Sequence, residues 1–225
     1  MRRALVAFVF AGCAAGPQPI PSSLSPAERL AASERALLTA KGVSATFDIE
    51  SMGENASVMK GSLELIDGNA LRVLAEGTMK NETVQVELDS REPDSPHRAS
   101  TKGPNVTSHR DPPAPKLREA VALGLSRMGL LHNLSVLAND RSVEKAEGGF
   151  DAWVKAIDVK AGAVDTINGV ACTRVDFGIQ VSGERMGDAS VCIADANGLP
   201  LSRKQTVHFP SGDMSVTETF VWKLP

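Results

Sequence analysis

The sequence predicts an α+β fold in which helices cover one face of an antiparallel sheet. Three observations carry this prediction. Apolar and polar residues alternate with period two over stretches such as 43–50 and 84–88, turn residues separate these stretches, and residues 115–138 form one markedly apolar helical stretch. The 225 residues are 42% apolar and 23% charged, which is enough for one domain with a substantial core.

The N-terminus has the composition of an export signal. Arg2 and Arg3 precede an apolar run over 4–11, far shorter than the roughly 20 residues needed to span a bilayer. Phe-Ala-Gly-Cys at 10–13 is typical of a lipobox, although Phe10 replaces the usual Leu. We therefore expect residues 1–12 to be a signal peptide and Cys13 to carry a lipid. The alternative is an ordinary secretory signal in which Cys13 is incidental.

Residues 13–24 then comprise the lipidated cysteine and a small, polar, proline-rich tether, and residues 25–225 form a single domain. The chain should be an exported, membrane-anchored lipoprotein, in the outer membrane or periplasm if the host is Gram-negative. A helix opens the domain, because Ser25 and Glu28 form a capping box around Pro26 and Gly42 is a natural stop.

Period-2 alternation follows the helix. The stretches 43–50, 58–65, 71–73 and 84–88 are separated by turn residues and indicate an antiparallel meander with one wet face. Six prolines lie in residues 91–115, so we expect neither strand nor helix there. This flexible proline-rich loop would be a functional flap or disordered.

The stretch 115–138 predicts a second helix, with a bend or break near Gly129, and a short connecting helix follows over 151–154. The last third alternates again and predicts strands over 164–167, 170–181, 189–194, 199–209 and 214–222. Cys172 and Cys192 are spaced to lie on neighbouring strands, where an oxidising compartment would allow a disulfide. The alternative is two buried free thiols.

The last two strands suggest a hairpin register. A turn centred between residues 211 and 212 would place Phe209 opposite Met214 and Val207 opposite Val216. Arg203 would lie diagonal to Glu218 on an otherwise apolar face, within reach of an ion pair. The alternative interpretation places Arg203 at the mouth of a cavity lined by this face.

Motifs for chemistry are absent. The sequence has no glycine-rich phosphate loop, no G-x-S-x-G and no Cys-x-x-Cys, so we expect no enzyme, cofactor or metal site. Asp89 and Asp94 near His97 and His109 are better explained as solvated loop charges than as metal ligands. Nucleic acid is an improbable partner, because the net charge is −3, aromatics are 4% and tyrosine is absent.

The order of lipobox, tether, helix, strands, apolar helix and further strands resembles the LolA/LolB-like superfamily of periplasmic and lipoprotein carriers. The resemblance covers residues 25–225, and the most similar segments are Gly-Leu-Pro-Leu at 198–201 and Asn-Gly-Val-x-Cys at 168–172. It implies an incomplete antiparallel β-barrel whose concave, apolar face is covered by helices and carries acyl chains. The chain departs from that pattern in having only seven Phe and two Trp.

Together these features predict a membrane-anchored lipoprotein that binds a lipid or another hydrophobic small molecule without catalysis. The alternatives are a lipoprotein that binds an envelope protein through the loop 91–115, and, with least support, an envelope hydrolase. A loosely covered apolar face would be a pocket, whereas a tightly covered one would be core. The expected cavity-lining residues are Phe47, Leu117, Val121, Leu125, Met128, Leu201, Arg203, Val207, Phe209, Phe220 and Trp222.

Overall fold

The computed structural model describes residues 17–53, 55–144 and 148–225, so the predicted signal peptide and Cys13 lie outside the described residues. The strands are β1 (Val43–Gly53), β2 (Ser57–Leu65), β3 (Leu71–Met79), β4 (Glu82–Asp89), β5 (His97–Lys102), β6 (Asn105–Arg110), β7 (Val154–Ile167), β8 (Val170–Val181), β9 (Glu184–Ala194), β10 (Pro200–Phe209) and β11 (Gly212–Lys223). The helices are α1 (Pro26–Thr39), α2 (Leu117–Leu123), the π-helix η1 (Gly124–Met128), α3 (Leu130–Ala138) and α4 (Gly149–Trp153).

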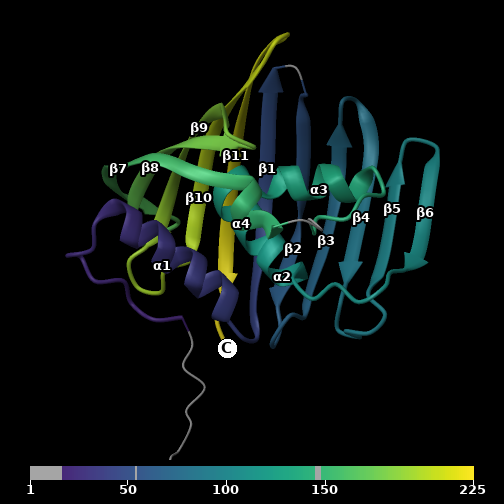
Figure 1. The fold of residues 1–225 in the computed structure, drawn as a ribbon, viewed down its shortest axis with the longest axis horizontal. Coiled ribbons are helices and arrows are strands. Elements are labelled where there is room, and N and C mark those ends of the chain that lie inside the picture. Colours follow the sequence, from purple (N-terminus) through teal and green to yellow (C-terminus); the bar gives the residue numbers. More distant parts are fainter. Residues whose placement is uncertain (1–16, 54, 145–147) are drawn as a thin grey trace, which may run out of the picture.

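The strands form one antiparallel sheet in the order β6-β5-β4-β3-β2-β1-β11-β10-β9-β8-β7. The sheet is curved and open, with β6 and β7 as its edges, and the helices lie together over one face (Figure 1). The predicted α+β class and the open antiparallel sheet covered by helices are confirmed. Among the described residues, no helix is both long and apolar enough to cross a membrane.

The predicted start of α1 is confirmed in detail. The Ser25 side chain accepts a hydrogen bond from the backbone of Glu28, and the Glu28 carboxylate accepts one from the backbone of Ser25. The helix ends at Thr39, and Gly42 has a φ of +64° as the chain turns into β1. Ile20, within the predicted tether, is only 8% exposed, and its N–H donates to the carbonyl oxygen of Asp195. The second half of the tether therefore packs against the domain.

The predicted meander is present as β1 to β4, and each strand pairs with its sequence neighbour. Alternate residues of β1, from Val43 to Ile49, are buried against the helices, while the residues between them are more exposed. The strands before the lid, β1 to β6, and the strands after it, β7 to β11, are joined because β1 also pairs with β11. In this pair, Phe47 of β1 lies opposite Phe220 of β11. This pairing joins the two regions into one surface.

The prediction that residues 91–115 contain no strand was wrong. Residues 97–102 and 105–110 form the hairpin β5–β6, which extends the sheet beyond β4. All six prolines lie outside the two strands, and Gly103 with Pro104 forms the turn, with a φ of +53° at Gly103. The hairpin lacks apolar alternation because its inward side chains include Arg98 and Ser100, so hydrophobic periodicity could not show it.

The apolar stretch forms three consecutive helical segments, α2, η1 and α3, which we call the lid. The predicted break lies at Gly129, whose φ and ψ of +89° and 155° separate η1 from α3. Such a conformation is essentially restricted to glycine. The lid begins two residues later than predicted and is followed by α4, where a short helix was expected.

The final hairpin has a different register from the one predicted. Phe209 pairs with Gly212, so the turn consists of residues 210 and 211 alone, and Val207 lies opposite Met214. Arg203 is therefore directly opposite Glu218 and not diagonal to it. The difference is two residues, and because side chains alternate with period two, every residue keeps its predicted face.

The disulfide between Cys172 on β8 and Cys192 on β9 is formed, with 5.5 Å between the two Cα atoms. Both sulfurs are buried in a small cluster with Ala194 and Leu201, separate from the main core. The alternative of two free thiols is thereby excluded in this structure. The bond links two strands near the edge of the sheet, where α1 packs against β7, β8 and β9.

Candidate ligand-binding site

Arginines fix the first part of the lid to the rest of the domain. Arg118, at the start of α2, donates to carbonyl oxygens at the end of α1 and in the β2–β3 turn, including those of Leu37 and Gly68. Arg127, at the end of η1, makes a two-pronged contact with Glu34 of α1, at 2.7 and 2.9 Å. Arg127 also donates to Asp151 at 2.6 Å. Buried or half-buried arginines therefore hold the helices α1, α2, η1 and α4 together.

The break in the lid is held from the sheet side by two opposed buried charges. Arg203 of β10 donates to the carbonyl oxygens of Ser126 and Arg127, at 3.3 and 2.8 Å, at the end of η1. Glu218 of β11 accepts a hydrogen bond of 2.9 Å from the backbone N–H of Leu131, in the first turn of α3. Arg203 thus lies at the C-terminal end of η1, where the helix dipole is negative, and Glu218 lies at the N-terminal end of α3, where it is positive.

No direct ion pair joins Arg203 and Glu218, although both lie in the described part of the chain and are at most 1% exposed. Burial raises the pKa of the Glu218 carboxyl above its ordinary value, and the Arg203 guanidinium opposes that rise. Burial lowers the pKa of Arg203 to about 10, which leaves it charged at neutral pH. The Nη1 atom of Arg203 also donates to Gln205, so the arginine is bonded on three sides.

Gly129 is required between these two charges. A Cβ atom at this position would lie 2.8 Å from Oε1 of Glu218 and 3.0 Å from Nη1 of Arg203. The prediction that Arg203 stands at a cavity mouth was wrong, because the lid covers it completely. The predicted ion pair is likewise replaced by separate contacts with the two helix ends.

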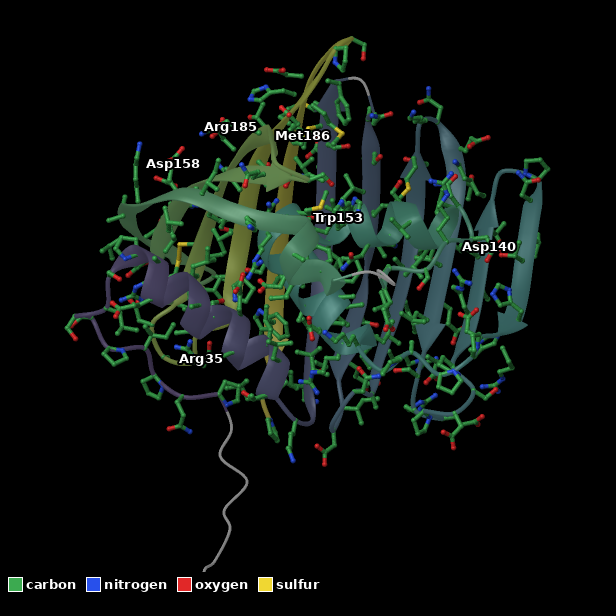
Figure 2. The ribbon with its side chains drawn as sticks, in the orientation of Figure 1. Arg35, Asp140, Trp153, Asp158, Arg185 and Met186 are labelled. Atoms are coloured by element: carbon green, nitrogen blue, oxygen red, sulfur yellow. A yellow bond between two sulfur atoms is a disulfide. The ribbon has the colours of Figure 1, made fainter. Side chains whose placement is uncertain are left out.

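Beyond this break, α3 and the hairpin tips of the sheet enclose a pocket of about 460 Å³. We call it the methionine pocket, because four of the seven methionines of the chain line it. Met186, one of them, lies on β9 above the level of Trp153 in Figure 2. Its lining residues are Asn55, Ser57, Met79, Lys80, Lys102, Met128, Leu131, His132, Ser135, Asn139, Ile179, Val181, Met186, Gln205, Val207, Phe209 and Met214.

Three of the eleven residues expected to line a cavity, Met128, Val207 and Phe209, lie in the methionine pocket. The others lie elsewhere. Buried in the main core are Phe47, Leu117, Val121, Leu125 and Phe220. Leu201 packs beside the disulfide, Arg203 holds the lid, and Trp222 is half-buried and donates from Nε1 to the carbonyl oxygen of Pro200.

Sequence reasoning missed most of the pocket. Met79, Met186 and Met214 lie near strand ends beside hairpin turns. Hydrophobic periodicity does not show which helix or strand such residues contact. The sequence nevertheless contains one indication of the pocket. A methionine lies within three residues of three hairpin turns, namely the turn after β3, the turn before β9 and the turn before β11.

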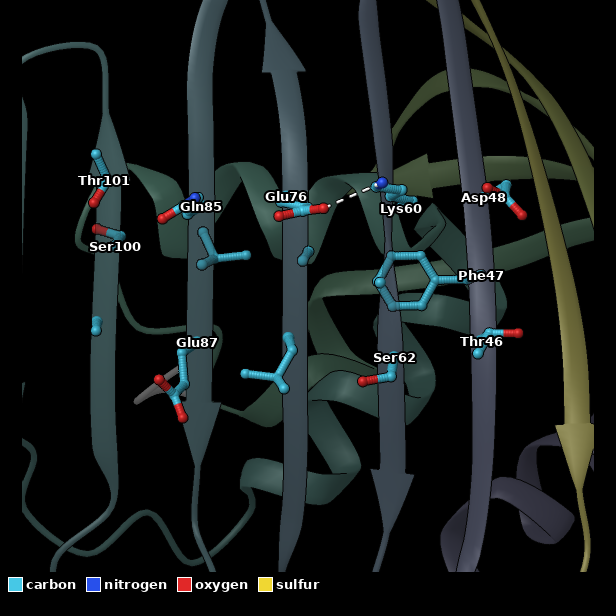
Figure 3. A pocket seen from close by; sticks show the side chains of 15 residues that line it. Thr46, Phe47, Asp48, Lys60, Ser62, Glu76, Gln85, Glu87, Ser100 and Thr101 are labelled. Atoms are coloured by element: carbon cyan, nitrogen blue, oxygen red, sulfur yellow. Dashed lines mark ion pairs between the residues drawn. The ribbon is translucent and has the colours of Figure 1, made fainter.

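The opposite face of the sheet carries a different hollow, of about 650 Å³, which is open, is lined mainly by polar side chains and also includes Phe47 in its lining. Figure 3 shows its cross-strand row, in which Asp48, Lys60, Glu76, Gln85 and Thr101 lie side by side on β1 to β5. Lys60 and Glu76 form an ion pair of 3.2 Å. Exposed pairs of this kind are typical of the solvated face of a sheet, so this hollow is a poor site for an apolar ligand.

Metal binding has no support in the described residues, where no cluster of three or more His, Cys, Asp and Glu side chains is arranged to hold an ion. His97 and His109 lie on the polar hairpin β5–β6. His109 contacts Asp111 at 2.9 Å, and Arg98 donates to the same carboxylate. These side chains form a local charge network at the edge of the sheet.

No protein-family model and no curated protein sequence matches the chain. Several solved structures are similar to it. The lipoprotein LppX of Mycobacterium tuberculosis is 14% identical, with a TM-score of 0.34 over 89% of this chain and 94% of LppX. MucB in the Pseudomonas aeruginosa MucA/MucB complex is 13% identical, with a TM-score of 0.36 over 88% of this chain, which spans about half, 55%, of that protein.

A third similar structure is NE2245 of Nitrosomonas europaea, described as a LolA superfamily protein. It is 8% identical, with a TM-score of 0.32 over 90% of this chain and 94% of NE2245.

Proposed function

We propose that this chain binds the hydrocarbon part of a lipid, or another hydrophobic small molecule, in the methionine pocket. The observation that carries the proposal is the pocket itself, an apolar space between the lid and the sheet that the core does not fill. Its volume lies within the roughly 300–1,000 Å³ that is usual for small-molecule sites. Each methylene group that leaves water for such a space contributes about 0.8 kcal/mol.

The lining favours ligands without a fixed shape. Methionine side chains are unbranched and polarisable, so they adapt to chains of different length and curvature. Among the described lining residues, Phe209 is the one aromatic residue besides His132. The pocket is therefore built from flexible thioethers and aliphatic side chains, which suits an acyl chain better than a flat ring.

The proposal includes no catalytic step. Among the described lining residues, the ionisable side chains are Lys80, Lys102 and His132, and the ring of His132 packs against Trp153 at 5.6 Å between centroids. We further propose that the chain is exported, that Cys13 carries a lipid anchor, and that the domain works at a membrane surface. The sequence of residues 1–13 supports these points.

Filling the pocket should test the proposal. The chain would be purified without detergent, and palmitate uptake would be followed by native mass spectrometry. Met186→Trp should abolish uptake, because the larger side chain occupies the pocket. Met52→Trp is the matched control, since Met52 is 63% exposed on the opposite face of the sheet. Wild-type protein that takes up no palmitate, or equal uptake by Met186→Trp, would contradict the proposal.

The alternative role, a lipoprotein that binds an envelope protein, has one supporting feature. β6 is an edge strand, its side chains are largely exposed, and edge strands can pair with a strand of another protein. Replacing Ser108, whose backbone N–H points away from β5, by Pro would block such pairing, and the methionine pocket, which this hairpin lines only through Lys102 near its turn among the described residues, should be unchanged. Loss of a co-purifying partner with intact palmitate uptake would support this role.

A further inference from the structure

The methionine pocket is cationic at one end, although the protein as a whole is acidic. Its lining includes Lys80 and Lys102, and no described lining residue is Asp or Glu. The net charge of the chain is −3 at neutral pH. A described lining that contains two ammonium groups and no carboxylate has a charge preference of its own in an acidic protein, although the Glu82 carboxylate lies close to Lys102 outside the lining.

The polar and apolar parts of the lining are separated along the sheet. The polar lining residues Asn55, Ser57, Lys80 and Lys102 come from the tips of β1 to β5, and Ser135 and Asn139 come from the adjoining part of α3 and its end. The apolar residues Ile179, Val181, Met186, Val207 and Phe209 come from β8 to β10, on the other side of β1 and β11 in the strand order. Two described lining residues depart from this division, the polar Gln205 on β10 and the apolar Met79 at the end of β3. The pocket therefore has the polarity of an amphiphile, with one polar end and one apolar end.

The two lysines differ in their local contacts. Lys102, at the end of β5, donates from Nζ to Oδ1 of Asn139 at 2.7 Å and lies 3.9 Å from the Glu82 carboxylate. Asn139 thereby holds this ammonium group at the end of α3. Lys80, in the β3–β4 turn with a φ of +50°, makes no side-chain hydrogen bond or ion pair with the described residues. Asn139 thus holds Lys102 in place, whereas Lys80 is exposed to solvent at the edge of the pocket.

We infer that the methionine pocket selects amphiphiles with a single anionic group, whose hydrocarbon chain lies against β8 to β10 and whose carboxylate or phosphate lies between Lys80 and Lys102. This inference rests on the proposed function and adds the class of headgroup to it. The ammonium groups would donate charge-assisted hydrogen bonds to the anion, and Lys102 would retain its contact with Asn139. A neutral headgroup would make neither of these charge-assisted contacts.

The test compares three ligands with the same sixteen-carbon chain: hexadecanoate, hexadecyl phosphate and hexadecan-1-ol. Each would displace the uncharged fluorophore Nile red from the full chain at pH 8 and low salt. The wild-type protein should bind at least one anion about tenfold more tightly than the alcohol. Which anion is preferred distinguishes a carboxylate from a phosphate headgroup, and added salt should reduce the preference.

Lys80→Gln combined with Lys102→Gln should remove the preference and leave the affinity for the alcohol unchanged. The control is Lys60→Gln combined with Lys204→Gln, which removes the same charge from the opposite face of the sheet. Equal binding of all three ligands by the wild type, or a preference that survives in the first double variant, would overturn the inference and leave the proposed function standing. Failure to bind any of the three would overturn both.

Discussion

The concave face has two ends that differ in how well the lid fills them. At the closed end, Phe47, Leu125 and Phe220 are each at most 2% exposed and belong to one continuous core. At the open end, Met128, Val207 and Phe209 are only partly buried and line a pocket. The same lid and the same strands therefore produce core at one end and cavity at the other.

The way in which the lid packs accounts for the difference. Arg118 and Arg127 tie the first half of the lid to α1 and α4, and Arg203 ties its midpoint to the sheet. Beyond Gly129, α3 continues across the sheet toward β4 and β5 and buries Leu130, Leu134 and Leu137 in the main core, whereas His132 and Ser135 on another side of α3 line the methionine pocket. An apolar face covered by a helix is thus not one site, because one side of the same helix can form core while another side borders a cavity.

The boundary between the two ends should be the most sensitive place to disturb. Arg203→Met leaves Glu218 as a buried charge without compensation, so we expect a loss of about 3–5 kcal/mol in the free energy of unfolding, measured with urea. Lys204→Met, on the neighbouring and exposed position of β10, should change stability far less. If the two variants were equally stable, the buried charges would not set the boundary.

Neighbouring positions on η1 allow the two ends to be compared directly. Leu125→Ala should cost about 2–5 kcal/mol of unfolding free energy, because it opens a cavity in the closed end. Met128→Ala removes a side chain that already borders empty space, so its cost should be about 1 kcal/mol or less. Palmitate uptake should show the opposite order, with the larger effect at Met128. A similar stability loss at both positions would remove the distinction between the ends.

The smallest expected effect is a pH dependence at Glu218. Burial raises the pKa of Glu218 in the folded protein above its ordinary value of 4.5, so the folded state holds this proton more tightly than the unfolded state. The contribution of Glu218 to stability is therefore fully present below pH 4.5 and falls as pH rises through the folded pKa. Glu218→Gln keeps an acceptor for Leu131 and removes this titration.

The measurement is the stability difference between Glu218→Gln and wild type, by urea unfolding at pH 5 and pH 8. Relative to the wild type, the free energy of unfolding of the variant should be higher at pH 8 than at pH 5. The difference should be about 1.4 kcal/mol for each unit by which the folded pKa is raised within that range. Glu50→Gln on the exposed face of β1 controls for the loss of one charge. A difference that does not change with pH would show that Glu218 is ionised in both states.

Features with a local cause were predictable from the sequence. The Ser25 capping box, the break at Gly129 and the covalent pairing of Cys172 with Cys192 each depend on residue types at short or characteristic spacing. The face of each residue in the last hairpin was also correct, because alternation survives a shift of two residues. The register of this hairpin was predicted incorrectly, because it depends on whether the turn contains two residues or four.

Features with a non-local cause were missed. The hairpin β5–β6 has polar side chains on both faces and is stabilised by pairing with β4, which no local pattern reveals. Ile20 docks against the β9–β10 turn, far away in sequence. The pocket is formed by one side of α3 and the hairpin ends of strands that are far apart in sequence, so of the expected lining residues only Met128, Val207 and Phe209 fell within it.

The concentration of thioethers also makes the open end sensitive to oxidants. Methionine is oxidised to a sulfoxide, which is polar and chiral, and reductases reverse the change. Partly buried sulfurs at Met128 and Met186 would then place S=O dipoles on the surface that receives hydrocarbon. Peroxide exposure would thereby lower the affinity of the pocket for apolar chains while the closed end, which is lined by Leu and Phe, kept its packing.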